Sequence, residues 1–154
     1  MILQIIGAVV SLAFAVFIIY VVLEKNKLEY IKQRTVSILN QYGLVHVEGK
    51  KIYFTTSKHS YQILFFRVPT NGELTINSKT MWEIIDSGTS KMIDQSIFLA
   101  TEKPKLVMIY PTTHVIKRYI NENEMVFVKP TDSFYEMNLI RTIELEEVLK
   151  EGIL

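Results

Sequence analysis

The sequence predicts an α+β protein in which a membrane-spanning helix precedes a single soluble domain. Three observations predict it. Residues 2–23 carry no charged side chain, and every charged residue lies at or after Glu24. Short β-branched and aromatic runs separated by turn residues follow between residues 44 and 76. From residue 80 onward, apolar patterns that fit helices and strands alternate. We expect a transmembrane anchor at residues 1–23 and an α+β domain at residues 24–154.

The charge-free run has the length of a membrane span. As a helix rising about 1.5 Å per residue, it would extend about 33 Å, enough to cross a hydrocarbon core of about 30 Å. A cleaved signal peptide is the alternative. The run lacks a basic segment before it, and its one small-x-small pattern, Ala13-Phe14-Ala15, lies inside the apolar stretch. The pattern therefore favours an uncleaved anchor.

The flanking charges predict the orientation of the anchor. Four cations follow the apolar run closely: Lys25, Lys27, Lys32 and Arg34. Lysine and arginine concentrate on the cytoplasmic side of membrane proteins. We therefore expect a single-pass protein of the cell membrane, with its N-terminus outside, its C-terminal domain in the cytoplasm and the lipid bilayer as one partner.

The overall composition excludes several classes of protein. The chain has 17 basic and 16 acidic residues and a net charge of +1. This charge is too small to favour binding of nucleic acid through the overall charge of the protein. Cysteine is absent, so a disulfide framework, a thiolate zinc site and a cysteine nucleophile are all excluded.

The first half of the domain is predicted to be a helix followed by a meander. Residues 24–42 carry an apolar stripe at helical spacing, which favours a helix packed on its own domain over a short coiled coil between two copies. Three strands are expected at residues 44–47, 51–56 and 61–68, with a hairpin turn at Gly49. Because the connections are short, the three strands should pair in sequence order, and residues 74–76 could add a short strand.

The second half is predicted to mix helices and strands. Helices are expected at residues 80–86, 91–100, 112–120 and 142–150, and strands at residues 105–110 and 125–128. The run from 106 to 128 would be a β-α-β unit with parallel strands. The meander and this unit would form one mixed sheet flanked by helices.

This order of elements resembles that of the restriction-endonuclease-like (PD-(D/E)XK) nuclease superfamily. The resemblance covers about residues 28 to 128. It implies an acidic residue on the second strand of the meander and an acid-x-lysine on the third, which together hold a divalent cation over the scissile phosphate. Here Phe65 occupies the expected acid position and Arg67 the lysine position. The first aspartate of the chain is Asp86, and the only Glu-x-Lys, Glu48-Gly49-Lys50, lies at a hairpin. The resemblance therefore implies a pseudoenzyme, in which a nuclease-like fold is reused for binding.

Candidate binding residues occupy the turns and strand ends of the meander and the segment after it. Trp82 is the only tryptophan, and Asn77 lies in a turn where binding residues often occur. The alternative is that Trp82 is a core residue and that Asn77 or Ser78 caps the next helix. The candidates are Lys58, His59, Arg67, Asn77, Lys79 and Trp82.

No motif predicts a catalytic residue, a metal site or a cofactor. His46, His59 and His114 have no spacing typical of metal ligands, and there is no phosphate-binding glycine motif. The expected function is a membrane-anchored binding or scaffold domain for a protein partner, without catalysis. The first alternative is a membrane-tethered module that binds or processes nucleic acid, recognised by a basic face that includes some of Lys50, Lys51, Lys58, Arg67 and Lys79. A hydrolase built on His59 and a nearby carboxylate is the second alternative.

Overall fold

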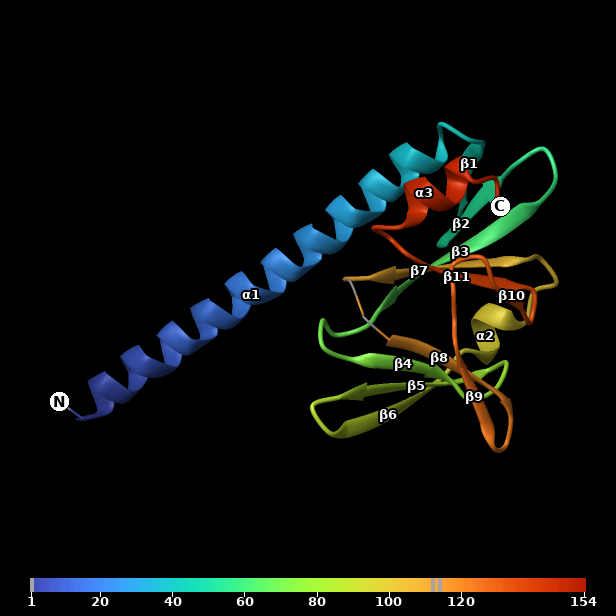
Figure 1. Ribbon diagram of the computed structural model, residues 1–154. Helices are drawn as coiled ribbons and strands as arrows, with labels where there is room; N and C mark the ends of the chain where they lie inside the picture. Colours follow the sequence, from blue (N-terminus) through green and yellow to red (C-terminus); the bar gives the residue numbers. More distant parts are fainter. Residues whose placement is uncertain (1, 112, 114) are drawn as a thin grey trace. The chain divides into compact units, whose positions relative to one another are not determined.

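The computed structural model describes residues 2–111, 113 and 115–154 (Figure 1). The chain divides into two compact units, Met1–Arg34 and Thr35–Leu154. Helix α1 (Ile2–Leu39) makes up the described part of the first unit and contributes its last residues to the second. The predicted α+β class is confirmed. Thr112 and His114, which belong to the predicted helix at 112–120 and to the three histidines, lie outside the described residues.

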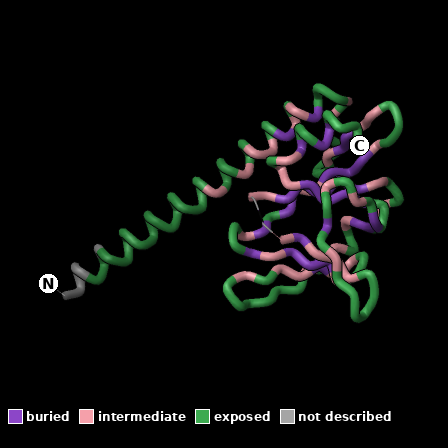
Figure 2. Tube along the Cα trace, in the orientation of Figure 1, coloured by how far each residue is buried: buried purple, intermediate pink, exposed green. Residues whose placement is uncertain are grey.

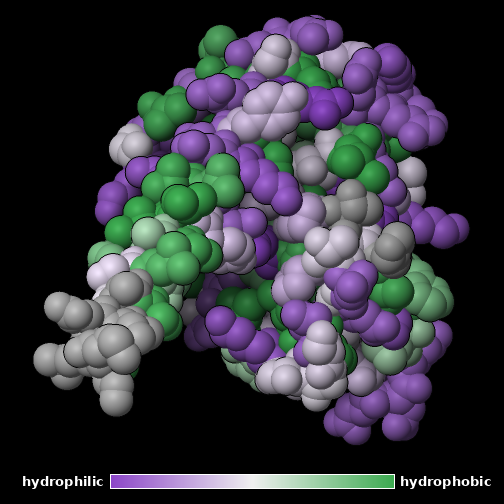
Figure 3. All heavy atoms as spheres, turned by 90° about the vertical axis from the view of Figure 1, so that its left-hand side faces the viewer, coloured by the Kyte–Doolittle hydropathy of each residue, from purple (hydrophilic) through white to green (hydrophobic). Residues whose placement is uncertain are grey.

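The first unit is a long helix with an apolar N-terminal part. The most apolar 18-residue window of α1 has a mean hydropathy of 1.9, and none of it is buried. Figure 2 shows the exposed helix, and Figure 3 shows hydrophobic side chains following it from its N-terminal end. A helix that is apolar around its whole circumference is normally surrounded by protein or by lipid. This helix is therefore long and apolar enough to span a membrane.

The second unit contains a six-stranded sheet, here called sheet A, in the order β1-β2-β3-β7-β11-β10. The predicted meander is confirmed, because β1 pairs with β2 and β2 with β3, both antiparallel. Gly49 in the first turn has a φ of 62°, a backbone conformation that glycine adopts without steric penalty. Strand β7 is parallel to both of its neighbours, β3 and β11. The strands of sheet A are β1 (Leu44–Glu48), β2 (Lys51–Thr55), β3 (Ser60–Arg67), β7 (Lys105–Tyr110), β10 (Ser133–Phe134) and β11 (Met137–Arg141).

A second, five-stranded sheet, here called sheet B, has the order β6-β5-β4-β8-β9. The chain leaves sheet A after β3, forms β4 to β6, returns as β7, leaves again for β8 and β9, and returns as β10 and β11. The prediction of one mixed sheet is therefore wrong. The strands of sheet B are β4 (Glu73–Ile76), β5 (Met81–Asp86), β6 (Thr89–Asp94), β8 (Val115–Asn121) and β9 (Glu124–Phe127).

Two of the predicted helices form the β5–β6 hairpin instead. Residues 80–86 give β5, and residues 91–100 give the end of β6 and one short helix, α2 (Ser96–Leu99). On β5, Trp82 and Ile84 pack into the core, whereas Ile85 is 37% exposed. This alternation has the period of a strand, and a run of six residues is too short to separate that period from a helical one.

The predicted β-α-β unit is also wrong. Residues 115–121 form β8, which pairs antiparallel with β9, and β7 and β9 belong to different sheets. A helix at residues 112–120 would place Val115/Ile116 and Tyr119/Ile120 on one face. In the strand, neighbouring side chains point to opposite faces, so Ile116 is 2% exposed while Val115 is only half-buried. Ile120, which is 51% exposed, lies at an irregularity in the pairing with β9 between Tyr119 and Asn121. β-branched and aromatic residues favour strands, and pairing with β4 and β9 decided the outcome.

Two hydrophobic clusters hold the second unit together. The larger one joins sheet A to sheet B and includes Trp82, Val107 and Ile116. The other lies on the opposite face of sheet A, where Leu39 at the end of α1 and Leu145 of α3 (Leu145–Lys150) pack on Met108. The last predicted helix is confirmed in shortened form, since α3 begins three residues later than expected. Sheet A is thus covered on both faces, and the space between the sheets is where a site could open.

Candidate functional site

The six predicted binding residues do not converge. Lys58 and His59 lie in the β2–β3 turn before β3, and Arg67 is the last residue of β3. At about 3.3 Å per residue, the length of β3 separates the two groups by roughly 23 Å. The His59 ring packs edge-on against Tyr61, with 5.9 Å between ring centroids.

The other three candidates belong to the β4–β5 turn and stabilise it. Trp82 is fully buried, and its Nε1 donates a hydrogen bond to the carbonyl oxygen of Lys79 at 3.2 Å. Asn77 Nδ2 donates to Glu83 Oε2 at 3.3 Å. The Ser78 hydroxyl accepts a hydrogen bond from the backbone N–H of Met81, so it holds a hairpin turn in place of the helix cap considered above. Trp82 therefore acts as a core residue, and its ring has no surface on which a ligand could stack.

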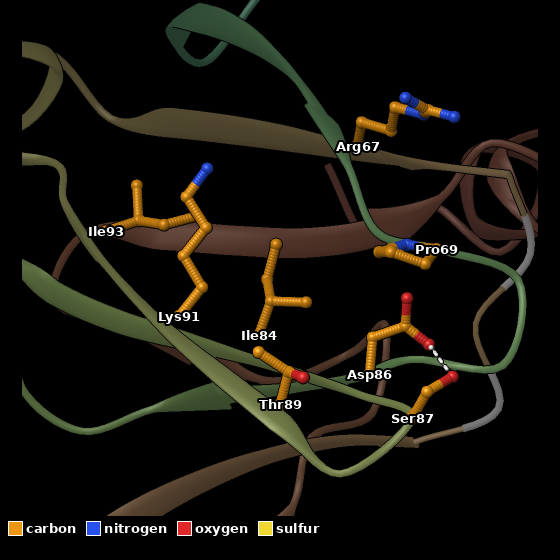
Figure 4. A pocket seen from close by; sticks show the side chains of 8 residues that line it. All are labelled: Arg67, Pro69, Ile84, Asp86, Ser87, Thr89, Lys91 and Ile93. Atoms are coloured by element: carbon orange, nitrogen blue, oxygen red, sulfur yellow. Dashed lines mark hydrogen bonds between the residues drawn. The ribbon is translucent and has the colours of Figure 1, made fainter.

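Arg67 lines a pocket of about 650 Å³ between the two sheets. Drug-sized ligands occupy pockets of about 300–1,000 Å³. Arg67 and Pro69 come from the end of β3, and the other lining residues come from β5, the β5–β6 turn and β6 (Figure 4). The complete lining is Arg67, Pro69, Ile84, Asp86, Ser87, Thr89, Lys91 and Ile93.

The period of the strands explains why this pocket carries charge. Side chains on β5 and β6 alternate between the two faces of sheet B, so Asp86 shares a face with Trp82 and Ile84. Ile84 and Ile93 both pack against the core between the sheets. The same face also carries Lys91, which is paired with Ile84 across the hairpin, and it ends in Asp86. Figure 4 shows the Lys91 side chain extending from β6 towards sheet A, and the Asp86 carboxylate pointing towards Pro69.

The pocket combines two cations, one carboxylate and two hydroxyl groups. Asp86 Oδ1 accepts a hydrogen bond from the Ser87 hydroxyl at 3.1 Å, and Ser87 has a φ of 49° in the tight turn. Within the described part of the chain, Lys91 Nζ has no hydrogen bond and no ion pair. A site of this composition can attract an anion through Lys91 while Ile84 and Ile93 contact an apolar group.

Asp86, Ser87, Thr89 and Lys91 were missed by the sequence analysis because the hairpin was assigned to two helices. A turn signal was present, since Ser87-Gly88 stands between two runs of alternating polarity. Assigned to strands, Asp86 and Lys91 would have been recognised as charges at positions that face a core.

A second charged cluster surrounds Lys105, which is 2% exposed. Its Nζ donates to Gln62 Oε1 at 3.1 Å, to the carbonyl oxygen of Thr101 at 3.0 Å and to the Thr101 hydroxyl. Burial lowers the pKa of Lys105 below its ordinary 10.5, and the positive charges of Lys51, Lys79 and Lys103 lower it further. Glu136 acts in the opposite direction. We call Lys51, Lys79, Lys103 and Lys105 the lysine group.

The lowered pKa of Lys105 predicts how stability changes with pH. Between the lowered pKa and 10.5, the unfolded chain binds a proton at this residue that the folded chain does not. Stability therefore rises as pH rises through that window. The free energy of unfolding of the wild type, relative to Lys105→Met, should increase as the pH rises towards 10.5 in urea titrations. Burial raises the pKa of Tyr61, but that effect is common to both proteins and cancels. A pH-independent difference would contradict the prediction.

The described residues contain no group of three or more His, Asp or Glu side chains that could hold a metal ion. In the same part of the chain, no carboxylate is hydrogen-bonded to His59. Comparisons with protein-family models, with curated proteins and with solved structures found no match.

Proposed function

We propose that this chain is a single-pass membrane protein whose second unit lies in the cytoplasm and acts by binding a partner or ligand, without catalysis. The observation that carries the proposal is helix α1. None of its most apolar 18-residue window is buried in protein, and exposing so many apolar side chains to water is strongly unfavourable. A lipid bilayer removes that penalty.

The charges after the apolar part support the cytoplasmic location. Four cations lie in α1 after its apolar part: Lys25, Lys27, Lys32 and Arg34. Cations this close to the end of a span are the ones that set orientation, and Glu24 and Glu29 count little against them.

The pocket between the sheets supports a binding role. Its charged residues sit at the end of a hydrophobic core, and its volume suits a small molecule or a side chain of a protein partner. Of the element order that resembles nuclease-like folds, this structure keeps the meander, whereas the predicted helix at 80–86 and the β-α-β unit are replaced by strands. On the meander alone, Phe65 and Arg67 stand at the positions that the resemblance assigns to a metal-binding acid and a catalytic lysine, which is the remaining basis for expecting a pseudoenzyme.

The absence of cysteine makes the topology directly testable. Ser57 is exposed in the β2–β3 turn, so Ser57→Cys introduces the only thiol of the chain on the surface of the second unit. A membrane-impermeant maleimide should label this variant only after the cells are permeabilised. The permeabilised sample is the control for reactivity. Labelling of intact cells would contradict the cytoplasmic location.

The lysine group favours a second candidate, a membrane-tethered module of nuclease-like fold that binds or processes nucleic acid. Lys103 Nζ also lies 4.4 Å from the centre of the Tyr53 ring, so cations and an aromatic ring are close together. Such surfaces bind single strands with strong salt dependence. This candidate predicts that a fluorescent oligonucleotide binds at low salt and that Lys51→Glu with Lys103→Glu abolishes binding. The absence of binding at low salt would reject it.

A further inference from the structure

The pocket between the sheets has features that define the chemistry of its ligand, and the inference that follows deepens the proposed binding function and rests on it. The pocket has an apolar part and a charged part. Ile84 and Ile93 line it and pack against the buried core. Pro69 supplies a further apolar surface on the side of sheet A. A hydrocarbon group entering here would be removed from water on several sides.

The charged part consists of one cation, Lys91, and one carboxylate, Asp86. Lys91 extends across from β6, and Asp86 is the single acid among the lining residues, whereas Arg67 stands between Phe66 and Val68 of the core and directs its guanidinium away from the pocket (Figure 4). Asp86 Oδ1 already accepts a hydrogen bond from Ser87. Of the lining cations, Lys91 makes no hydrogen bond or ion pair with any described residue, so its three donors are available to an anion.

From these features we infer that the pocket binds a small amphiphilic anion, a carboxylate attached to a short hydrocarbon chain. The carboxylate lies against Lys91, where a charge-assisted hydrogen bond forms. The chain lies along Ile84 and Ile93. A soluble carboxylate and a fatty acid released from the bilayer share this chemistry.

Another explanation of Lys91 makes no reference to a ligand. Strand β6 is at the edge of sheet B, and an inward-pointing charge on an edge strand prevents pairing with another molecule. On that explanation, removing the charge causes self-association and leaves carboxylate binding unaffected. The two explanations therefore predict different results for the same variant.

Trp82 provides the readout, because it is the only tryptophan and lies two residues before Ile84 on the same face of β5. The full chain in a non-ionic detergent is titrated with sodium octanoate, and fluorescence reports binding. Each methylene removed from water should tighten binding about fourfold, so hexanoate should bind more weakly than octanoate by roughly an order of magnitude. Octanol and acetate, which lack the charge or the chain, should bind much more weakly than octanoate.

The decisive variant is Lys91→Glu, which should weaken octanoate binding by about tenfold or more, whereas Lys91→Arg should retain it. Lys50→Glu, the same charge change at an exposed turn between β1 and β2, is the matched control and should bind as the wild type does. Octanoate that merely enters the micelle would affect all variants equally. Two further ligands distinguish a soluble carboxylate from a fatty acid released by the bilayer. Hexanoate stays in water, whereas laurate is carried by the micelle. Binding of either one supports the inference.

Equal responses of the wild type and Lys91→Glu, or binding of octanol as tight as that of octanoate, would overturn the inference. Light scattering of Lys91→Val tests the edge-strand explanation, and self-association with unchanged octanoate binding would favour it. These results are independent of topology. If Ser57→Cys were labelled in intact cells while octanoate bound as expected, the cytoplasmic location would fail and the ligand assignment would stand.

Discussion

Two arginines placed in the middle of the apolar part of α1, by Ala13→Arg together with Val16→Arg, should release the chain from membranes. Each arginine at the centre of a span disfavours insertion by about 2.5–3.5 kcal/mol, and each apolar residue contributes only about −0.3 to −0.6 kcal/mol. The pair therefore offsets most of the insertion free energy of the helix. The wild type should stay in the membrane pellet after extraction with alkaline carbonate, and the double variant should appear in the supernatant or be degraded.

The matched control is Ala13→Leu together with Val16→Leu, which changes the same positions and keeps the helix apolar. This control should remain in the pellet. If the double arginine variant were as resistant to carbonate as the wild type, α1 would not be the membrane anchor, and the proposed function would lose its main support.

Replacing Trp82 with alanine should lower the free energy of unfolding by about 3–5 kcal/mol, because it leaves a large cavity in the core. Trp82 is fully buried, and its ring packs edge-on against Phe66 with 5.1 Å between centroids and 68° between planes. The midpoint of thermal unfolding of the second unit, followed by far-UV circular dichroism of the full chain in detergent, should fall by roughly 10–20 °C.

Trp82→Phe separates packing from hydrogen bonding. Phenylalanine keeps most of the buried ring and loses the hydrogen bond to the Lys79 carbonyl, so the free energy of unfolding should fall by only about 1–2 kcal/mol. If Trp82→Ala changed stability by less than 1 kcal/mol, Trp82 would not be a core residue, and its prediction as a binding residue would regain weight.

The meander was predictable from the sequence because its signals are local. Gly49 marks a turn whose φ is positive, and the strands on either side pair in sequence order. The β5–β6 hairpin was not predictable in the same way. Met81 to Asp86 satisfies helical and strand periods alike, and pairing with β4 and β6 decides between them.

The candidate site depended still more on distant contacts. Arg67 was identified as a candidate, yet the residues that complete its pocket, Asp86 and Lys91, lie some twenty residues later on the other sheet. Likewise, the partners of the Lys105 amine include Gln62, which is 43 residues earlier. Neither pairing has a signature in the spacing of residues.

The sequence by itself determined the division of the chain between an apolar helix and an ordinary α+β domain, because transfer of a side chain out of water depends on its own chemistry and that of its neighbours along the helix. Tertiary structure alone decided which strands entered sheet A or sheet B and which charges met in the space between them. Strand pairing and burial depend on residues that are far apart in the chain. Local preference therefore leaves both helix and strand open for a short segment, and the distant contacts decide between them.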